Sequence, residues 1–534
     1  MQQHNIDYLP TSLTPLSQTP SDLQVGCLLI EELQQAASLV DFKEMLNRSA
    51  KLATFVKTSV NQLLLLDELT AMTQQDTLSS FLAIESVAAV QHEDASKVLI
   101  DCLSHADISV RRQATWKLSD RRPAAAALTL LLQQLCLGGI DTMHAHQTLS
   151  HWAKFEPELI TQMLSKALLT HDDDIARARL TDLLGTLHAD KVNGMLTRLA
   201  TDTNESVPAR VAAISAMGSR ADSFSTLLQQ LKQQDNDIGA HAALAIHDQR
   251  MLKLAPLPHR GGGLRICQLV LAKVDRTLSS GGCGETGGVA SLLVSLGDAL
   301  VRQPGIDQVL TIGLGSVEEA ISSLSAKDNT SQPYRIIAAG DDMRPMNSTN
   351  AWEHLPVLKR SIQRCLGNFG AVDLIHLRML DAATFAAADV ANTLSIPICF
   401  SFAPDPQNTV QALHARGQFN RRAFVDADAQ TNLWFRARML EQMGRNVGHV
   451  ALFPQPKCKL LLQDIRKDLR HHKQQSVTIA EGIDIQLIRQ AALESDEANY
   501  NDSKGVISDL ANKICANRRH LPILLSVGRF HPIK

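Results

Sequence analysis

Several residue classes and patterns that define other kinds of protein are scarce or absent in this sequence. Aromatic residues make up only 4% of the 534 residues, which fits helices packed with Leu and Ala better than an all-β fold. The nine cysteines are scattered and form no C-x-x-C pair. We therefore expect neither a disulfide framework nor a structural zinc site, but reduced thiols in the cytoplasm.

Long apolar runs and an excess of charge of one sign are also absent. No run approaches the roughly 20 residues of a membrane-spanning helix, and the N-terminus lacks the basic-then-apolar order of a signal peptide. The 52 Lys and Arg residues oppose 55 Asp and Glu residues, for a formal net charge of −3. We expect no membrane span and no nucleic-acid partner. A length of 534 residues predicts two or three domains.

Helical periodicity is abundant in residues 22–253, where Leu and Ala recur at spacings of three and four. Residues 1–21 are rich in Pro, Ser and Thr and are predicted to form a flexible arm. A repeat is visible inside the helical stretch. Four segments begin with acidic or polar residues, followed by an apolar anchor and then small and basic residues. The anchors are Val110, Ile175, Val207 and Ile238.

The spacing of these anchors suggests a two-helix unit. From Ile175 to Val207 is 32 residues and from Val207 to Ile238 is 31, while the gap of 65 before Ile175 leaves room for a degenerate copy around "GGIDTMHAHQTL". The unit resembles the short HEAT-type repeat, which stacks into an α-solenoid. A solenoid offers a concave surface for a protein partner; a spacer or stability module is the alternative.

Three histidines, His144, His146 and His151, lie close together within this stretch. On a variable repeat we interpret them as solvated or core histidines rather than as metal ligands.

A linker at residues 254–263, "LAPLPHRGGG", separates this region from a different pattern. Short apolar segments then alternate with helical stretches, which predicts a parallel, doubly wound sheet with sites at the carboxyl ends of its strands. The expected strands are residues 264–272, 308–315, 334–340, 372–377 and 396–403.

A glycine-rich segment, "SSGGCGETGGVASLLVSLGDAL", precedes an amphipathic helix after the first expected strand. Such a turn exposes backbone N–H groups where the helix dipole favours an anion. It contains a literal G-x-G-x-x-G. However, "KVDRTLSS" separates it from the strand, and no acidic residue closes the next strand, so a dinucleotide site is the weaker interpretation.

Four motifs in order resemble retaining glycosyltransferases of group 1 (family 4), most closely the sucrose-synthase and sucrose-phosphate-synthase branch. They are "GETGGVASLLVSLGDAL", "DLIHLRMLDAATFAA", "EGIDI" and "LPILLSVGRFHPIK", within residues 264–534. The resemblance implies two Rossmann-like domains, of which the first binds mainly the acceptor and the second the nucleotide diphosphate sugar. The acceptor-side domain would span residues 264–485. Residues 486–534 would be a linker and the first strand of the donor domain.

The resemblance also implies roles for particular residues. Gly284, Glu285, Thr286, Gly287 and Gly288 would form the loop that touches donor phosphate and acceptor. Two residues at the end of a later strand, His376 and Asp381, would line the acceptor pocket. Two cations, Arg529 and Lys534, would bind the donor diphosphate, or would be ordinary exposed charges. Such a pair neutralises the leaving group without a metal, so neither a metal nor another cofactor is expected.

The sequence departs from the family pattern at one strand, where the family usually places a histidine near the reacting sugar. Phe402 and Ala403 stand there, so no catalytic residue is assigned. Asp426 and Asp428 form a D-x-D, which holds a divalent cation in other glycosyltransferases but is more common in loops and helix caps. "RKDLRHHKQQ" is interpreted as a solvated helix face.

The sequence thus predicts a HEAT-like solenoid fused to a glycosyltransferase that transfers a sugar to a sugar or sugar phosphate. The family pattern beyond "VGRFHPIK" would supply most of the donor domain. We therefore expect a fragment with little activity alone, and robust turnover of a nucleotide sugar would contradict this. The alternative is a non-catalytic interaction protein with a degenerate glycosyltransferase domain. The sequence names neither the donor sugar, nor the nucleotide base, nor the acceptor.

Overall fold

The computed structural model describes most of the first 402 residues, residue 416 and three later segments. The described residues are 22–39, 42–59, 62–220, 223–253, 262–274, 287–326, 330–338, 346, 350–402, 416, 421–444, 449–452 and 475–478. Helices fill the first half of the chain, and a parallel sheet with flanking helices follows. The expected order of a helical region and then an α/β region is confirmed. Among the described helices, none is long and apolar enough to cross a membrane.

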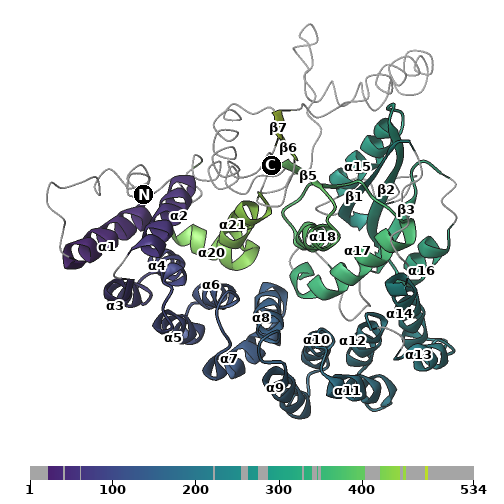
Figure 1. The fold of residues 1–534 in the computed structure, drawn as a ribbon, viewed down its shortest axis with the longest axis horizontal. Coiled ribbons are helices and arrows are strands. Elements are labelled where there is room, and N and C mark those ends of the chain that lie inside the picture. Colours follow the sequence, from purple (N-terminus) through teal and green to yellow (C-terminus); the bar gives the residue numbers. More distant parts are fainter. Residues whose placement is uncertain are drawn as a thin grey trace, which may run out of the picture.

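The helical region forms an arc of two rows of helices, and the sheet lies on its inner side (Figure 1). The inner row consists of α4 (Thr77–Ala89), α6 (Ile108–Leu118), α8 (Gly139–Trp152), α10 (Asp174–Leu184), α12 (Val207–Gly218) and α14 (Asp237–Lys253). The outer row consists of α3 (Gln62–Met72), α5 (Asp94–Asp101), α7 (Ala125–Leu135), α9 (Pro157–Thr170), α11 (Asp190–Thr201) and α13 (Ser225–Leu231). At one end of the arc, α1 (Asp22–Ser38) and α2 (Phe42–Thr58) pack against α3 and α4.

The repeated segments of the sequence are the starts of inner helices. The acidic residues before the anchors accept hydrogen bonds from the first turn: Asp107 from Ser109 N at 2.8 Å and Asp173 from Ala176 N at 2.7 Å. Pro208 stands in the first turn of α12, where the missing N–H costs nothing. The segment expected to be a degenerate copy forms α8, between α6 and α10.

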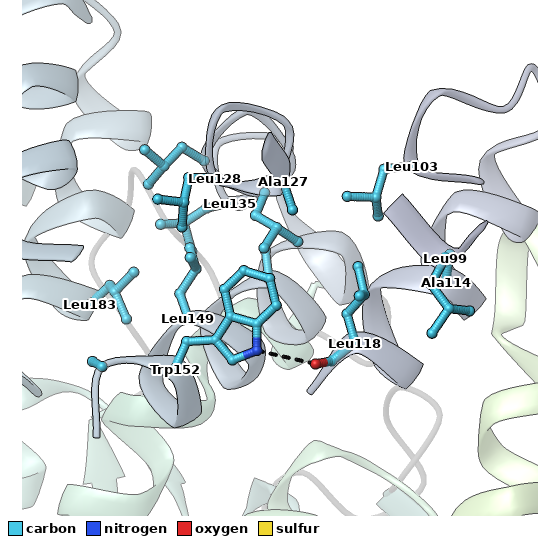
Figure 2. Packing of buried hydrophobic residues seen from close by; sticks show 14 of the residues in the cluster. Leu99, Leu103, Ala114, Leu118, Ala127, Leu128, Leu135, Leu149, Trp152 and Leu183 are labelled. Atoms are coloured by element: carbon cyan, nitrogen blue, oxygen red, sulfur yellow. Dashed lines mark hydrogen bonds between the residues drawn. The ribbon is translucent and has the colours of Figure 1, made fainter. Parts of the chain in front are cut away.

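The core of the helical region consists of Leu and Ala side chains between the two rows. Trp152 is fully buried there, and its indole Nε1 donates a hydrogen bond to Leu118 O at 3.2 Å (Figure 2). The indole can be buried because its polar atom has a partner. This contact joins α8 to the end of α6, the preceding inner helix.

The sheet has seven parallel strands in the order β3-β2-β1-β4-β5-β6-β7. The strands are β1 (Leu264–Lys273), β2 (Ile306–Gly315), β3 (Tyr334–Ala338), β4 (Leu374–Leu377), β5 (Ile398–Phe402), β6 (His449–Leu452) and β7 (Gln475–Thr478). The first five correspond to the expected strands, and the last two were not expected. Gln268 pairs with His376, which pairs with Cys399, so these three side chains share one face.

Helices cover both faces of the sheet. On one face, α15 (Gly287–Leu300) packs on β1 around Val270 and Leu293. On the other face, α17 (Leu355–Phe369) and α18 (Ala382–Thr393) bury Ile375 and Leu377 of β4. At the β3 edge, α16 (Val317–Ser325) packs between β3 and α14.

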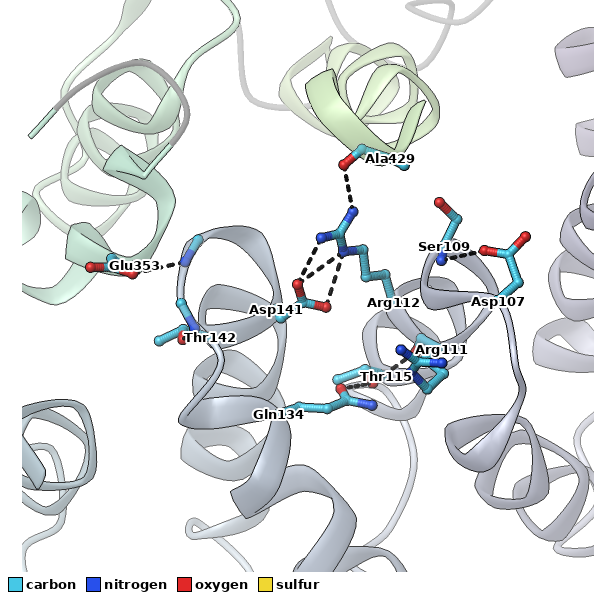
Figure 3. A network of polar contacts seen from close by, with 12 residues as sticks. Asp107, Ser109, Arg111, Arg112, Thr115, Gln134, Asp141, Thr142, Glu353 and Ala429 are labelled. Carbon is cyan, nitrogen blue, oxygen red and sulfur yellow. Dashed lines mark hydrogen bonds and ion pairs between the residues drawn. The ribbon is translucent and has the colours of Figure 1, made fainter. Parts of the chain in front are cut away.

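Two later helices, α20 (Arg421–Thr431) and α21 (Leu433–Gly444), lie against the helical region. Trp434 of α21 packs on Phe42 and Phe81, with ring centroids 6.1 and 5.1 Å away. Arg112 of α6 binds the Asp141 carboxylate and donates to the carbonyl of Ala429 at 3.0 Å (Figure 3). The concave side was expected either to bind a protein partner or to serve as a spacer, and the partner stays a prediction. The chain's own later elements contact several helices of the inner row.

Candidate functional site

The carboxyl edge of the sheet, between β1 and β4, is the candidate site. These strands are neighbours although two strands lie between them in the sequence. In such sheets the connections after the two central strands run to opposite faces and leave a crevice where ligands bind. The segment after β1 leads to α15, and the segment after β4 leads to α18.

The first turn of α15 differs from the first turns of the helices that follow β2 and β4. α16 begins with a capping box of Ser316 and Glu319, and α18 is capped by Asp381. Both N-termini therefore carry the chain's own carboxylate. α15 begins with Gly287 and Gly288 and has no acidic residue in its first turn. A Cβ on Gly288 would meet no atom of the described residues within 4 Å, so the described part of this turn leaves room for an external anion.

Buried side chains hold α15 tightly on the sheet. Gln268 of β1 donates from Nε2 to Leu293 O at 2.6 Å and to Thr311 Oγ1 at 2.9 Å. Helix α15 approaches closely at Gly297, where a Cβ would lie 2.1 Å from Gln332 Nε2. A larger residue there would push the helix and its N-terminal turn away from the sheet.

His376 lies on β4, on the same sheet face as α15, and is partly buried. Its Nε2 is 2.8 Å from Ser401 Oγ on β5. Burial, and secondarily the charge of Arg378, lowers the pKa of His376 to about 4. The ring is therefore neutral near pH 7, with one donor and one acceptor nitrogen. So weak a base is suited to orienting a substrate hydroxyl rather than to removing its proton.

Asp381 follows β4 and caps α18, accepting a hydrogen bond from Thr384 N at 2.9 Å. Burial raises the pKa of Asp381, and this bond opposes the rise. Its carboxylate thus has a structural role that would exist with or without a ligand. Its predicted place in an acceptor pocket remains a prediction.

An ion pair stands at the carboxyl ends of β1 and β2. Lys273 Nζ is 2.9 Å from Glu319 Oε1, and both side chains are about half exposed. The other oxygen of Glu319 accepts from Ser316 N at 2.9 Å. The end of β1 also bulges against β2, and Gly313 permits this, since a Cβ there would lie 2.0 Å from Val274. Sequence reasoning missed Lys273 because one lysine at a strand end looks like an ordinary exposed charge.

Several of the other expected site residues lie outside the described residues. They are Gly284, Glu285, Thr286, Arg529 and Lys534. Ala403, which follows β5, also lies outside them.

The D-x-D residues are within the described part of the chain, on α20. Asp426 is exposed, whereas Asp428 is buried and accepts from Trp434 N at 2.7 Å. Asp428 is thus a helix-end residue, the alternative that the sequence favoured. In the part of the chain that the structure describes, no group of three or more His, Cys, Asp or Glu could hold a metal.

The three clustered histidines include core residues, as the sequence analysis allowed. His144 is buried between Trp116 and Phe435, with ring centroids 6.0 and 4.7 Å away. Burial lowers the pKa of His144 to about 3 and that of His146 to about 4. Both are therefore neutral near pH 7.

Comparisons with known proteins do not assign the chain to a family: no family model matches it, and no curated protein is significantly similar to it. The resemblance to glycosyltransferases therefore stays a prediction from the motifs.

Proposed function

We propose that the sheet and its helices are the acceptor-side Rossmann-like domain of a retaining glycosyltransferase. It would take part in sugar transfer from a nucleotide diphosphate sugar to a sugar or sugar phosphate. The helices before it would form a HEAT-like solenoid that holds this domain in place. The observation that carries the proposal is the topology: the diglycine turn of α15 follows β1, while His376 and Asp381 lie on and just after β4, the neighbour of β1 in the sheet.

Each feature supplies a part that the reaction needs. The first turn of α15 presents backbone N–H groups toward an anion, which suits a phosphate of the donor or of the acceptor. His376 offers one donor and one acceptor nitrogen to hydroxyl groups. The tight packing of α15 through Gln268 fixes the turn relative to the strands, and a fixed geometry is what positions two substrates for reaction.

Acceptor binding tests the proposal without requiring turnover. Saturation-transfer difference NMR on the 534-residue chain would compare a panel of hexoses and hexose monophosphates. At least one compound is expected to bind, and His376→Ala is expected to abolish or strongly weaken its signal. His92→Ala is the matched control, because His92 is a partly exposed histidine next to α5, in the helical region. Circular dichroism would verify that both variants fold. Binding that His376→Ala leaves unchanged would contradict the proposed site.

A non-catalytic scaffold is the second candidate. It is favoured by Phe402, which ends β5 where the resemblance calls for a histidine. A scaffold would bind none of the sugars in the NMR panel. In that case a protein partner would be expected on the outer row or at the ends of the arc, because the chain's own later elements contact several helices of the inner row.

A further inference from the structure

A groove runs between two neighbouring helices of the outer row, α9 and α11 (Figure 1). Its volume is about 430 Å³, and it is open to solvent. The two helices meet where Ser165 Oγ donates to Met195 Sδ at 3.4 Å. A small molecule would stay largely in water in so open a hollow, whereas a peptide segment could lie along it. The lining residues are Ser165, Leu169, Lys191, Gly194, Met195 and Arg198.

The groove exposes apolar surface and bare backbone. The Leu169 side chain, near the end of α9, is 77% exposed, and Met195 of α11 is half-buried. Gly194 stands in the middle of α11, where a Cβ would meet no atom of the described residues within 4 Å. Glycine is unfavourable inside a helix, and no packing contact within the described ranges requires it here. Its effect is to leave room for another chain to approach the helix closely.

Two cations lie on the α11 side of the groove. Lys191 and Arg198 are exposed, and neither side chain forms an ion pair or a hydrogen bond with a described residue. They are two helical turns apart, so they share one face at a separation of about 10 Å along the axis. No acidic residue lines the groove. The neighbouring outer helices α7 and α13 contain no charged residue, so the positive charge on the outer row is narrow at this point.

We propose that this groove binds an acidic peptide segment of a partner protein, with two carboxylates about 10 Å apart and an apolar residue between them. The carboxylates would pair with Lys191 and Arg198, and the apolar residue would cover Leu169 and Met195. A nucleic acid or an anionic membrane needs a wider basic surface, which the neutral helices α7 and α13 do not provide. The site is independent of the proposed sugar transfer, because the sheet lies on the inner side of the arc.

Selection from a displayed library of random peptides against the full 534-residue chain tests the proposal. We expect the enriched peptides to carry two Asp or Glu residues on either side of an apolar residue. Fluorescence anisotropy of a labelled enriched peptide then measures affinity. The double change Lys191→Gln and Arg198→Gln should weaken binding about three- to tenfold, since exposed ion pairs contribute modestly. Gly194→Leu fills the groove and should weaken binding at least about tenfold.

Controls separate loss of the groove from loss of the fold. Leucine is a better helix former than glycine, so Gly194→Leu is expected to keep α11 intact, which circular dichroism would verify. Thr129→Leu and Lys232→Gln are the matched controls, because both residues are exposed on or just after other outer helices. Both should bind the peptide like the wild type.

An acidic consensus whose affinity falls with added salt, in the groove variants and not in the controls, would support the site. Three results would overturn it: no enriched peptide, enrichment of peptides without acidic residues, or unchanged affinity in the folded groove variants. Tighter binding of the same groove by poly(U) RNA or by phosphatidylserine vesicles would assign it to a polyanion and would overturn the proposal as well.

Discussion

The helical region and the α/β region meet along a seam whose two ends are built from different chemistry. At the apolar end, helices α2, α4 and α6 contact α21 largely through rings: Trp434 packs on Phe42 and Phe81, and Phe435 packs on Trp116. One buried ion pair, between Arg438 of α21 and Glu85 of α4, also crosses the seam at this end. At the ionic end, α10 and α14 contact η4 (Ala351–His354) and α17 through charged pairs. These pairs are Arg179–Glu353, Arg360–Asp182 and Arg364–Asp248.

The difference separates the source of stability from the source of orientation. Ring packing removes large apolar surfaces from water and tolerates small changes of angle. A buried ion pair contributes little net free energy after desolvation, but any arrangement that separates its two charges is strongly unfavourable. We infer that the apolar end supplies most of the attraction, and that the ionic end fixes how α17, and with it the sheet, lies on the arc.

Removing one charge at the ionic end should have the largest effect on stability. Arg364→Met leaves the Asp248 carboxylate buried without its bidentate partner, which typically costs about 3–5 kcal/mol. Burial works to lower the pKa of Arg364, but the Asp248 carboxylate outweighs it and the pKa is raised, so the pair is strongly coupled. Urea unfolding followed by circular dichroism would measure the loss.

A double variant sharpens this result. Arg364→Met combined with Asp248→Leu removes both charges, and we expect most of the lost stability to return, because no unpaired charge remains. Equal losses in the single and double variants would mean that packing of the arginine stem, rather than charge, holds this end. Arg198→Gln, on the outer row, should change stability by less than about 0.5 kcal/mol.

The second-largest effect on stability is expected from a change of pH, through a buried carboxylate at the apolar end. Burial raises the pKa of Asp428 from 3.8 to about 6, while the Trp434 N–H opposes the rise. Between these two values the folded chain keeps a proton that the unfolded chain loses. This contribution to stability is therefore full below about pH 4 and is lost as the pH rises through 6.

The isosteric change Asp428→Asn removes this titration and keeps an acceptor for Trp434 N. Relative to the variant, the wild-type chain should lose about 2–3 kcal/mol between pH 4 and pH 7. Urea unfolding of both chains across this range gives the difference directly. A difference that does not change with pH would show that Asp428 is not the buried acid that its contacts indicate.

The sequence predicted the two regions but not their seam. The hydrophobic period and the N-cap residues of a helix depend only on residues close together in the sequence. The starts of α6, α10, α12 and α14 could therefore be predicted from the repeat. The contact of Phe42 with Trp434 joins residues at opposite ends of the described chain. An amphipathic pattern shows that a face is apolar without showing what covers it. β6 and β7 have four residues each, too short for a period to be recognised.

The candidate site could be predicted only in part, for a similar reason. His376 and Asp381 were found through motif order. The contact of Ser401 with His376 depends on the register between β4 and β5, which the sequence does not reveal. A serine inside a strand also matches no motif that would mark it as a site residue.

Shortening one ring at the apolar end should have a smaller effect than either change of charge. Phe435 lies 4.7 to 6.0 Å from four other rings: those of Trp116, His144, Trp352 and Phe385. Phe435→Leu keeps most of the apolar volume and loses the ring contacts, so we expect a loss of about 1–2 kcal/mol. The exposed Phe155 provides the control, since Phe155→Leu should be nearly neutral. A loss above that of Arg364→Met would reverse the proposed order of the two ends.

The smallest effect is expected at a third carboxylate, away from the seam. Asp381→Ala removes the cap of α18 and should cost about 1 kcal/mol, whereas Asp381→Asn keeps an acceptor for Thr384 N and should cost a few tenths at most. The pair of variants separates structure from binding. If Asp381 also lines an acceptor pocket, Asp381→Asn will weaken sugar binding in the NMR assay at nearly unchanged stability. If both variants bind like the wild type, this carboxylate serves only to hold the helix.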